Sequence, residues 1–265
     1  MQAGDIIYIE SLERFTDGGI LEEARYIPLE IKHETDDYIV IYKPKWVLSH
    51  PNSVWDLETP SVVARAYHHY KDLPSTGNFI RAWLVHRLDR ETDGYMILAK
   101  TEQWLAYFKD LFMQKSWAET IAAKEAVPLR KHYRAISQLN IKWKKFLQSI
   151  APDMPYIHTQ DVIPNTPNPS IKTWITKFLK TESCADDTVY SIYGVGEYIY
   201  IDLEILTGRT HQIRYHLSSN GLPILWDYLY HPWYAHTDSA THPMQLSAVY
   251  LGFTDIYGEE VEITI

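Results

Sequence analysis

The stretch "LVHRLDRETDGYMILAKT", residues 84–101, places a dense group of polar residues between two apolar runs. The run before it is "AWLV" at 82–85, and the run after it is "YMILA" at 95–99. Apolar runs of this length are typical of buried strands, and Asp93-Gly94 predicts a turn because glycine tolerates a positive φ. We therefore expect a loop between two strands, which is where functional sites tend to lie. An ordinary solvated loop with local salt bridges is the alternative.

The composition predicts a globular protein that does not span a membrane. The 265 residues are 46% hydrophobic, enough for a sizeable core, and no apolar run reaches the length of a membrane helix. The N-terminal residues 1–19 lack the basic start and apolar centre of a signal peptide. Cys184 is the one cysteine, so we expect a reducing compartment, the cytoplasm, and we expect a monomer. We expect no metal site, because His231, His236 and His242 lack the i, i+4 spacing of helical ligands.

Charge is distributed unevenly along the chain. The net charge of −9 argues against a generic nucleic-acid-binding domain, since such domains are usually basic. Residues 1–60 hold twelve acidic and five basic side chains, whereas residues 81–150 hold seven Asp or Glu and thirteen Lys or Arg. A basic segment around the opening loop would attract phosphates. Composition alone leaves open the alternative that these lysines only cover helix surfaces.

Hydrophobic periodicity predicts more strands than helices. We expect strands at about 3–10, 38–42, 131–139 and 197–206. We expect helices at 60–71, at 101–115 with Thr101 as N-cap, and after Thr210, with Thr210 as the candidate N-cap and Asn220-Gly221 as the end. The proline-rich span 140–170 predicts an irregular surface insertion. Because the strands are not joined by regular crossover helices, we predict an α+β fold with a mixed, largely antiparallel sheet and flanking helices.

Three separated segments carry polar residues that strands and helices do not require. They are "HRLDRETDG" (86–94), "KHYRA" (131–135) and "LTGRTHQIRYH" (206–216). In the third, a strand leads through Gly208 and Arg209 into a helix N-terminus, which offers free backbone N–H groups and a cation to an anion. An ordinary strand-to-helix turn is the alternative for this segment.

Together the three segments resemble the motifs of the RluA-type pseudouridine synthases. The first is similar to H-R-L-D-x-x-T-S-G, with Asp93 in place of the serine. The second is similar to K-x-Y-x-A, and the third to G-R-x-H-Q-I/L-R-x-H. Weaker similarities cover residues 36–51, 172–176 and 221–230, so that the resemblance spans about 30–255. The chain departs from the family pattern at Trp46 and Trp226, which replace glycines, and at Ser247, which replaces a histidine.

The resemblance implies a pseudouridine synthase fold with a central active-site cleft and the isomerisation of a uridine in rRNA or tRNA. It makes Asp89 the essential carboxylate, which would attack uracil C6 or act at the ribose. Arg214 would pair with Asp89, Tyr133 would stack on the uracil and help to remove the C5 proton, and the uridine would be flipped out of the RNA. It implies no cofactor and no metal. The RNA-binding candidates are Arg87, Arg90, Lys131, Arg134, Arg209, His211 and Gln212, and the supporting candidates are His86, Thr92, Gly94 and Ile213.

The resemblance also predicts the domain organisation. Many members of the family carry an RNA-binding S4 domain, for which residues 1–28 are too short, so we interpret them as a short extension, with "AGDIIYIE" similar to the closing strand of such a domain. Residues 29–265 would form the catalytic domain. Two other functions stay open: a non-catalytic RNA-binding module derived from the enzyme, and a glycosidase-like hydrolase that would need a second carboxylate beside Asp89.

Overall fold

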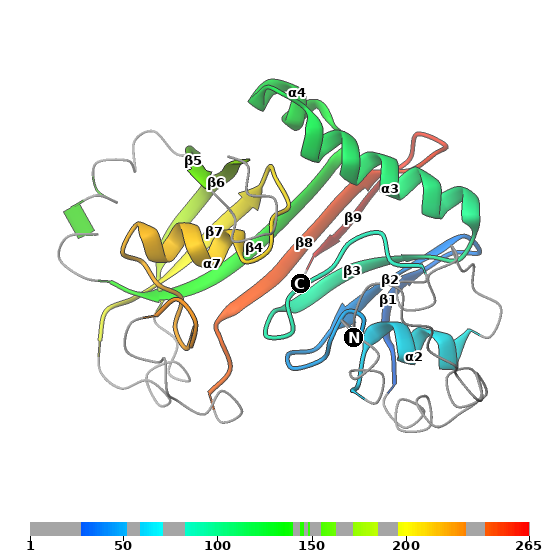
Figure 1. Cartoon of the computed structure of the whole chain (residues 1–265), viewed down its shortest axis with the longest axis horizontal. Coiled ribbons are helices and arrows are strands. Elements are labelled where there is room, and N and C mark those ends of the chain that lie inside the picture. Colours follow the sequence, from blue (N-terminus) through cyan, green and yellow to red (C-terminus); the bar gives the residue numbers. More distant parts are fainter. Residues whose placement is uncertain are drawn as a thin grey trace, which may run out of the picture.

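A single sheet of nine strands organises the part of the chain that the computed structural model describes, residues 28–51, 59–70, 83–139, 144–145, 148, 155–162, 172–184, 196–231 and 242–264 (Figure 1). The order in the sheet is β1-β2-β3-β8-β4-β7-β6-β5, with β9 paired to β8. Every pair is antiparallel except β3 with β8, so the predicted mixed, largely antiparallel α+β fold is confirmed. The strands are β1 (Glu30–Glu34), β2 (Tyr38–Lys43), β3 (Asp93–Ala99), β4 (Leu129–Gln138), β5 (Tyr156–Val162), β6 (Lys172–Ser183), β7 (Tyr198–Ile205), β8 (Leu246–Thr254) and β9 (Glu260–Thr264).

The helices that the described residues form beside the sheet are α2 (Val62–His69), α3 (Glu102–Trp117), α4 (Ile121–Ala126) and α7 (Gln212–Ser219). The predicted cap of α3 is confirmed, because the Thr101 side chain accepts a hydrogen bond from the Trp104 backbone N–H. The predicted cap of α7 is wrong. His211, in the left-handed conformation with φ 57°, precedes that helix and makes no side-chain cap bond. The predicted C-terminal end at Asn220-Gly221 is confirmed.

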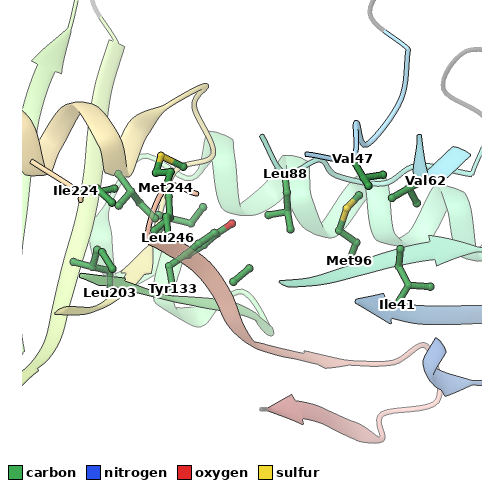
Figure 2. Close-up of a cluster of buried hydrophobic side chains, with 14 of the residues drawn as sticks. Ile41, Val47, Val62, Leu88, Met96, Tyr133, Leu203, Ile224, Met244 and Leu246 are labelled. Atoms are coloured by element: carbon green, nitrogen blue, oxygen red, sulfur yellow. The ribbon is translucent and has the colours of Figure 1, made fainter. Parts of the chain in front are cut away.

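The core lies on both faces of the sheet because side chains alternate along each strand. On β2, Ile39 and Ile41 join a cluster that also includes residues of α2 and α7, whereas Tyr38 and Val40 join a second cluster with residues of α3. Figure 2 shows part of the first cluster, in which Tyr133 of β4 lies beside residues of β7, β8 and the chain after α7, here Leu203, Leu246, Ile224 and Met244. Tyr133 is therefore held in place by the same hydrophobic core that stabilises the fold.

The two halves of the sheet meet where β3 lies parallel to β8. Gly94 is opposite Ala248 there, and a Cβ built on Gly94 would lie 2.2 Å from the Ala248 carbonyl oxygen. Gly94 also has φ +123°, which disfavours any other residue. The prediction of a turn at Asp93-Gly94 is therefore wrong. Both residues belong to β3, and the glycine is needed for the close approach of two strands.

Two other predictions from the sequence differ from the structure. The predicted strand before the polar loop is wrong within the described residues 83–85, because Trp83 has a positive φ and Leu84 makes only an isolated bridge to Leu98. The span 140–170 is not irregular throughout, since it contains β5, which pairs along its whole length with β6. The predicted strand at 3–10 lies outside the described residues. No helix of the described residues is long and apolar enough to cross a membrane.

Candidate active site

The three polar segments line one cavity of about 290 Å³. Residues of the loop that leads into β3, of β4, of the end of α3 and of the β7–α7 connection form its walls. The strand order explains why these segments meet. In the sheet β8 lies between β3 and β4, so the loop that leads into β3 and the strand β4 lie on opposite sides of one strand. The site residues in the lining are His86, Arg87, Asp89, Thr92, Lys131, Tyr133, Arg209, His211, Gln212, Ile213 and Arg214.

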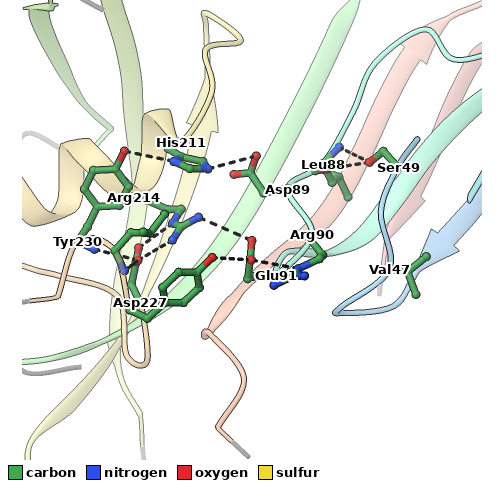
Figure 3. A network of polar contacts seen from close by, with 12 residues as sticks. Val47, Ser49, Leu88, Asp89, Arg90, Glu91, His211, Arg214, Asp227 and Tyr230 are labelled. Atoms are coloured by element: carbon green, nitrogen blue, oxygen red, sulfur yellow. Dashed lines mark hydrogen bonds and ion pairs between the residues drawn. The ribbon is translucent and has the colours of Figure 1, made fainter. Parts of the chain in front are cut away.

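The loop at 86–92 is held by buried hydrogen bonds to the segment after β2. The Ser49 hydroxyl donates to the Leu88 carbonyl oxygen at 2.7 Å and accepts from the Leu88 N–H at 3.0 Å. The Arg90 carbonyl accepts from the Lys43 ammonium at 3.2 Å and from the Trp46 N–H at 2.7 Å. These bonds fix the backbone on both sides of Asp89 (Figure 3).

Two of the supporting candidates shape this loop. The Nε2 atom of His86 accepts a hydrogen bond from the Ile97 N–H at 3.0 Å, and its ring stacks on Phe112 at 4.7 Å. Burial lowers the pKa of His86 well below its usual value, so the ring stays neutral as an acceptor. The Thr92 N–H donates to the Asp89 carbonyl at 3.1 Å and closes a tight turn around the carboxylate.

Asp89 directs its carboxylate toward the β7–α7 connection. Its Oδ1 atom lies 3.9 Å from Nε2 of His211, and the other ring nitrogen of His211 lies 3.2 Å from the Tyr230 hydroxyl. The Asp89 side chain keeps 19% of its surface exposed, so it remains reachable from the cavity. Burial lowers the pKa of His211, while the negative charge of Asp89 opposes that shift.

Tyr133 lies on β4 with its ring in the core and its hydroxyl directed toward the side of Leu88 (Figure 2). Only 6% of its surface is exposed. Burial, and secondarily the charge of Asp89, raises the pKa of the phenol well above its ordinary value. Tyr133 is therefore a neutral hydrogen-bond donor at physiological pH and shares the cavity with Asp89.

The predicted pairing of Arg214 with Asp89 is wrong in this structure. Arg214 instead forms a bidentate pair with Asp227, in which Nε lies 2.8 Å from Oδ2 and Nη2 lies 2.7 Å from Oδ1 (Figure 3). Its Nη1 atom is buried without a hydrogen-bond partner among the described residues and lies 3.8 Å from Oε2 of Glu91. The rings of Tyr228 and Tyr230 flank the guanidinium at 5.6 and 5.3 Å, so the cation is fixed from several sides.

Sequence reasoning missed the acidic partners of Arg214. Glu91 is 5% exposed and Asp227 is fully buried, and the Tyr228 hydroxyl donates to Oε1 of Glu91 at 2.8 Å. A buried carboxylate requires a partner, but one sequence does not show which residues are buried. The similarity of residues 221–230 to a family segment was the available signal for Asp227 and Tyr230.

The predicted RNA-binding residues do not all line the cavity. Arg87 and Arg90 are exposed at the loop, and Lys131 and Arg209 line the cavity. Arg134 is not among the lining residues, because alternate side chains of β4 point to opposite faces and its guanidinium is bound to Asp202 at 2.7 and 2.8 Å. Arg134 therefore does not share the cavity with Lys131 and Arg209.

Gln212 and Ile213 have roles within the protein. The Gln212 amide donates to the Ile175 carbonyl and to the Thr176 hydroxyl at 2.9 and 3.1 Å, and its oxygen accepts from the Thr207 hydroxyl at 2.7 Å. Since both ends of the amide are engaged, Gln212 shapes the β7–α7 connection and has little capacity left for the predicted RNA contact. Ile213 packs in the first core cluster.

Two departures from the family pattern contact each other. Asp93, which replaces a serine, accepts a hydrogen bond at 2.6 Å from the hydroxyl of Ser247, which replaces a histidine. The two residues are also Cα partners where β3 meets β8. The Tyr42 hydroxyl donates to the other carboxylate oxygen at 2.6 Å, and Lys45 lies 3.7 Å away. The two departures from the family pattern are thus in direct contact where β3 meets β8.

The chain is similar in sequence to known RNA pseudouridine synthases. A family model described as RNA pseudouridylate synthase matches residues 37–219. The chain is 30% identical over 204 residues to an uncharacterized RNA pseudouridine synthase of Aquifex aeolicus, covering 77% of this chain and 56% of that protein. It is 31% identical over 207 residues to ribosomal large subunit pseudouridine synthase D of Borreliella burgdorferi, covering 77% and 55%. The chain thus spans little more than half the length of these relatives.

Solved structures support the fold. Human RNA Pseudouridylate Synthase Domain Containing 1 superposes with a TM-score of 0.62 at 19% identity, covering 94% of this chain and 84% of that one. Human RNA Pseudouridylate Synthase Domain Containing 4 superposes with a TM-score of 0.60 at 19% identity, covering 93% and 91%. At these identities the likeness concerns the fold alone.

Proposed function

The chain belongs to the RNA pseudouridylate synthase family, and on that premise we propose that it converts a uridine within structured rRNA or tRNA to pseudouridine, with Asp89 as the catalytic carboxylate. The observation that carries the proposal is the meeting of Asp89 and Tyr133, from separate segments, in one cavity. We further propose that residues 29–265 form the catalytic unit.

The reaction detaches uracil from ribose, rotates it and rejoins it through C5, so that the proton on C5 is lost and N1 gains one. A partly exposed carboxylate held on a rigid loop can act as the nucleophile, at uracil C6 or at the ribose. Tyr133 would stack on the base. Because its pKa is raised, its hydroxyl would act as a neutral donor or relay and not as a phenolate base.

Arg214 would stabilise the negative charge of the Asp89 carboxylate by electrostatic attraction across the site, and not through a direct ion pair. Its charge and that of Asp89 attract each other, and its unpartnered Nη1 atom is a donor in the cavity wall. His211, which directly precedes α7, lies 3.9 Å from Asp89. The target uridine would have to leave its RNA helix to reach the cavity.

The test is release of tritium from RNA labelled at C5 of uridine. Separate rRNA and tRNA pools transcribed in vitro should be incubated with the parent protein and with Asp89→Asn. We expect the parent to release tritium from one of the pools, and Asp89→Asn to release none while its affinity for that RNA is unchanged, because the amide keeps the shape and loses the nucleophile.

A matched control is Asp161→Asn, an exposed carboxylate on the edge strand β5, which should turn over like the parent. Turnover by Asp89→Asn at the parent rate would contradict the assignment of Asp89. RNA binding by the parent without tritium release from either pool would instead favour the non-catalytic RNA-binding module.

A further inference from the structure

One cation in the cavity wall lacks an anionic partner. Lys131, on β4, places its ammonium 4.8 Å from the centre of the Phe112 ring, on the side of the cavity formed by α3. Gly208 lies across from it, so that a Cβ there would be 3.9 Å from the Lys131 nitrogen. This half-buried ammonium makes no ion pair and no side-chain hydrogen bond with the described residues.

The neighbouring charges make this isolation unusual. Lys115, also in the cavity wall, is neutralised by Glu204 at 3.1 Å. Lys131 has instead the like charge of Lys115 and the neutral ring of His86 nearby. Burial lowers the pKa of Lys131 to about 7, which reflects the cost of holding a cation there without a counter-charge.

A second unsatisfied donor lies in the same wall. The Nε atom of Arg209 is buried and has no hydrogen-bond partner among the described residues. Arg209 belongs to the connection between β7 and α7 that includes Gly208, and both line the cavity with Lys131. Two donors without a hydrogen-bond partner among the described residues, the Lys131 ammonium and Nε of Arg209, therefore belong to the wall of one cavity.

We propose that Lys131 and Arg209 form a phosphate-binding subsite that takes a phosphate group attached to the flipped uridine. A phosphate supplies the missing negative charge and accepts from both donors at once. This proposal rests on the proposed function, because it takes the ligand that binds beside Asp89 and Tyr133 to be a nucleotide.

The spacing along β4 fits a nucleotide. Lys131 and Tyr133 are two residues apart, so their side chains leave the same face of the strand about 6.6 Å apart along its axis. A uracil ring stacked on Tyr133 would then have a ribose-linked phosphate near Lys131, with the ribose between them and toward Asp89. The subsite thus holds the nucleotide by its phosphate while the base is released from the sugar.

The experiment measures binding by calorimetry to the full chain, with uridine, uridine 5′-monophosphate and uridine 3′-monophosphate as probes. We expect one monophosphate to bind the parent at least about tenfold more tightly than uridine, as a charge-assisted hydrogen bond would give. Lys131→Met should lose this preference and Lys131→Arg should keep most of it. The control Lys180→Met, an exposed lysine paired with Glu182, should behave like the parent.

Thermal unfolding provides a second measurement. Because no carboxylate depends on Lys131, Lys131→Met should be at least as stable as the parent in the absence of ligand. A large loss of stability, or an equal preference for the monophosphates in the parent and Lys131→Met, would overturn the subsite. Preference of the parent for the 5′ or the 3′ compound would assign the phosphate to that side of the nucleotide.

The phosphate subsite and the proposed function can be refuted independently of each other. If the parent forms pseudouridine but Lys131→Met keeps the phosphate preference, the subsite is wrong and the function stands. If the parent forms none but Lys131→Met alone loses the preference, the function is wrong and the phosphate subsite stands.

Discussion

Arg214 is bound by Asp227 through two hydrogen bonds of 2.8 and 2.7 Å, in a site where both side chains are almost completely buried. Arg214→Ala would leave the Asp227 carboxylate without its cation, and breaking a buried pair in this way costs about 3–5 kcal/mol of unfolding free energy. Urea unfolding followed by tryptophan fluorescence would measure the loss.

A matched control for Arg214 is Arg134→Ala. Arg134 makes the same bidentate geometry with Asp202, but its side chain is 42% exposed, and exposed pairs contribute about 1 kcal/mol or less. Equal losses of stability in the two variants would show that burial does not decide the importance of the Arg214 pair.

The contact between Asp93 and Ser247 predicts energetic coupling of two positions that are 154 residues apart. In a double-mutant cycle with Asp93→Ala and Ser247→Ala, we expect the two losses of stability to be non-additive by about 0.5–3 kcal/mol, since each variant removes the same charge-assisted hydrogen bond. Tyr42→Phe, which removes the other hydroxyl donor to Asp93, should be coupled to Asp93→Ala as well. Additive losses at Asp93 and Ser247 would contradict the contact.

His216 predicts a loss of stability in mild acid. It is fully buried beside the Thr176 hydroxyl at 2.9 Å, and burial lowers its pKa to about 4. The unfolded chain, with a histidine pKa of about 6.5, binds the proton first as the pH falls. The contribution of the neutral ring is therefore complete above about pH 6.5 and is lost as the pH falls toward 4.

The measurement for His216 is the free energy of unfolding between pH 7 and pH 4.5. His216→Gln should show a shallower fall with decreasing pH than the parent, and His33→Gln on the edge strand β1 should show the parent slope. If the unfolding free energy of His216→Gln fell with pH as steeply as that of the parent, other groups would cause the acid sensitivity.

The exposed arginines differ in their expected contribution to RNA affinity. Arg90 is exposed on the loop beside Asp89, with its guanidinium 5.6 Å from the Trp46 ring. Arg90→Ala should lower RNA affinity and reduce the slope of log affinity against log salt by about one unit if one phosphate contact is lost. Arg134→Ala should leave both unchanged, because Asp202 neutralises that guanidinium away from the cavity.

Salt titrations of RNA binding, with turnover measured in parallel, would check this difference. Arg87 lines the cavity itself, so Arg87→Ala should lower turnover more than affinity. If Arg134→Ala flattened the salt dependence as much as Arg90→Ala, the RNA would contact Arg134 as well, and the expected difference between the two arginines would be wrong.

The sequence by itself determined several of the strands and helices and the segments that supply the candidate site. The alternation in β7 and the apolar runs of β2 and β3 predicted their strands, and the stripe of α3 with its Thr101 cap predicted that helix. The three polar segments predicted the lining of the cavity, including Asp89 and Tyr133. These features are local or belong to motifs, because the period of a strand or helix and the order of a motif are written in neighbouring residues.

Only the tertiary structure decided the partners of these residues. Arg214 binds Asp227 and not Asp89, Asp93 binds Ser247 in place of forming a turn, and Arg134 faces away from Lys131's cavity. Each outcome depends on which strands lie side by side and which face of the sheet is covered. A buried charge takes the partner that packing brings within about 3 Å, and that distance is set by residues far apart in the chain.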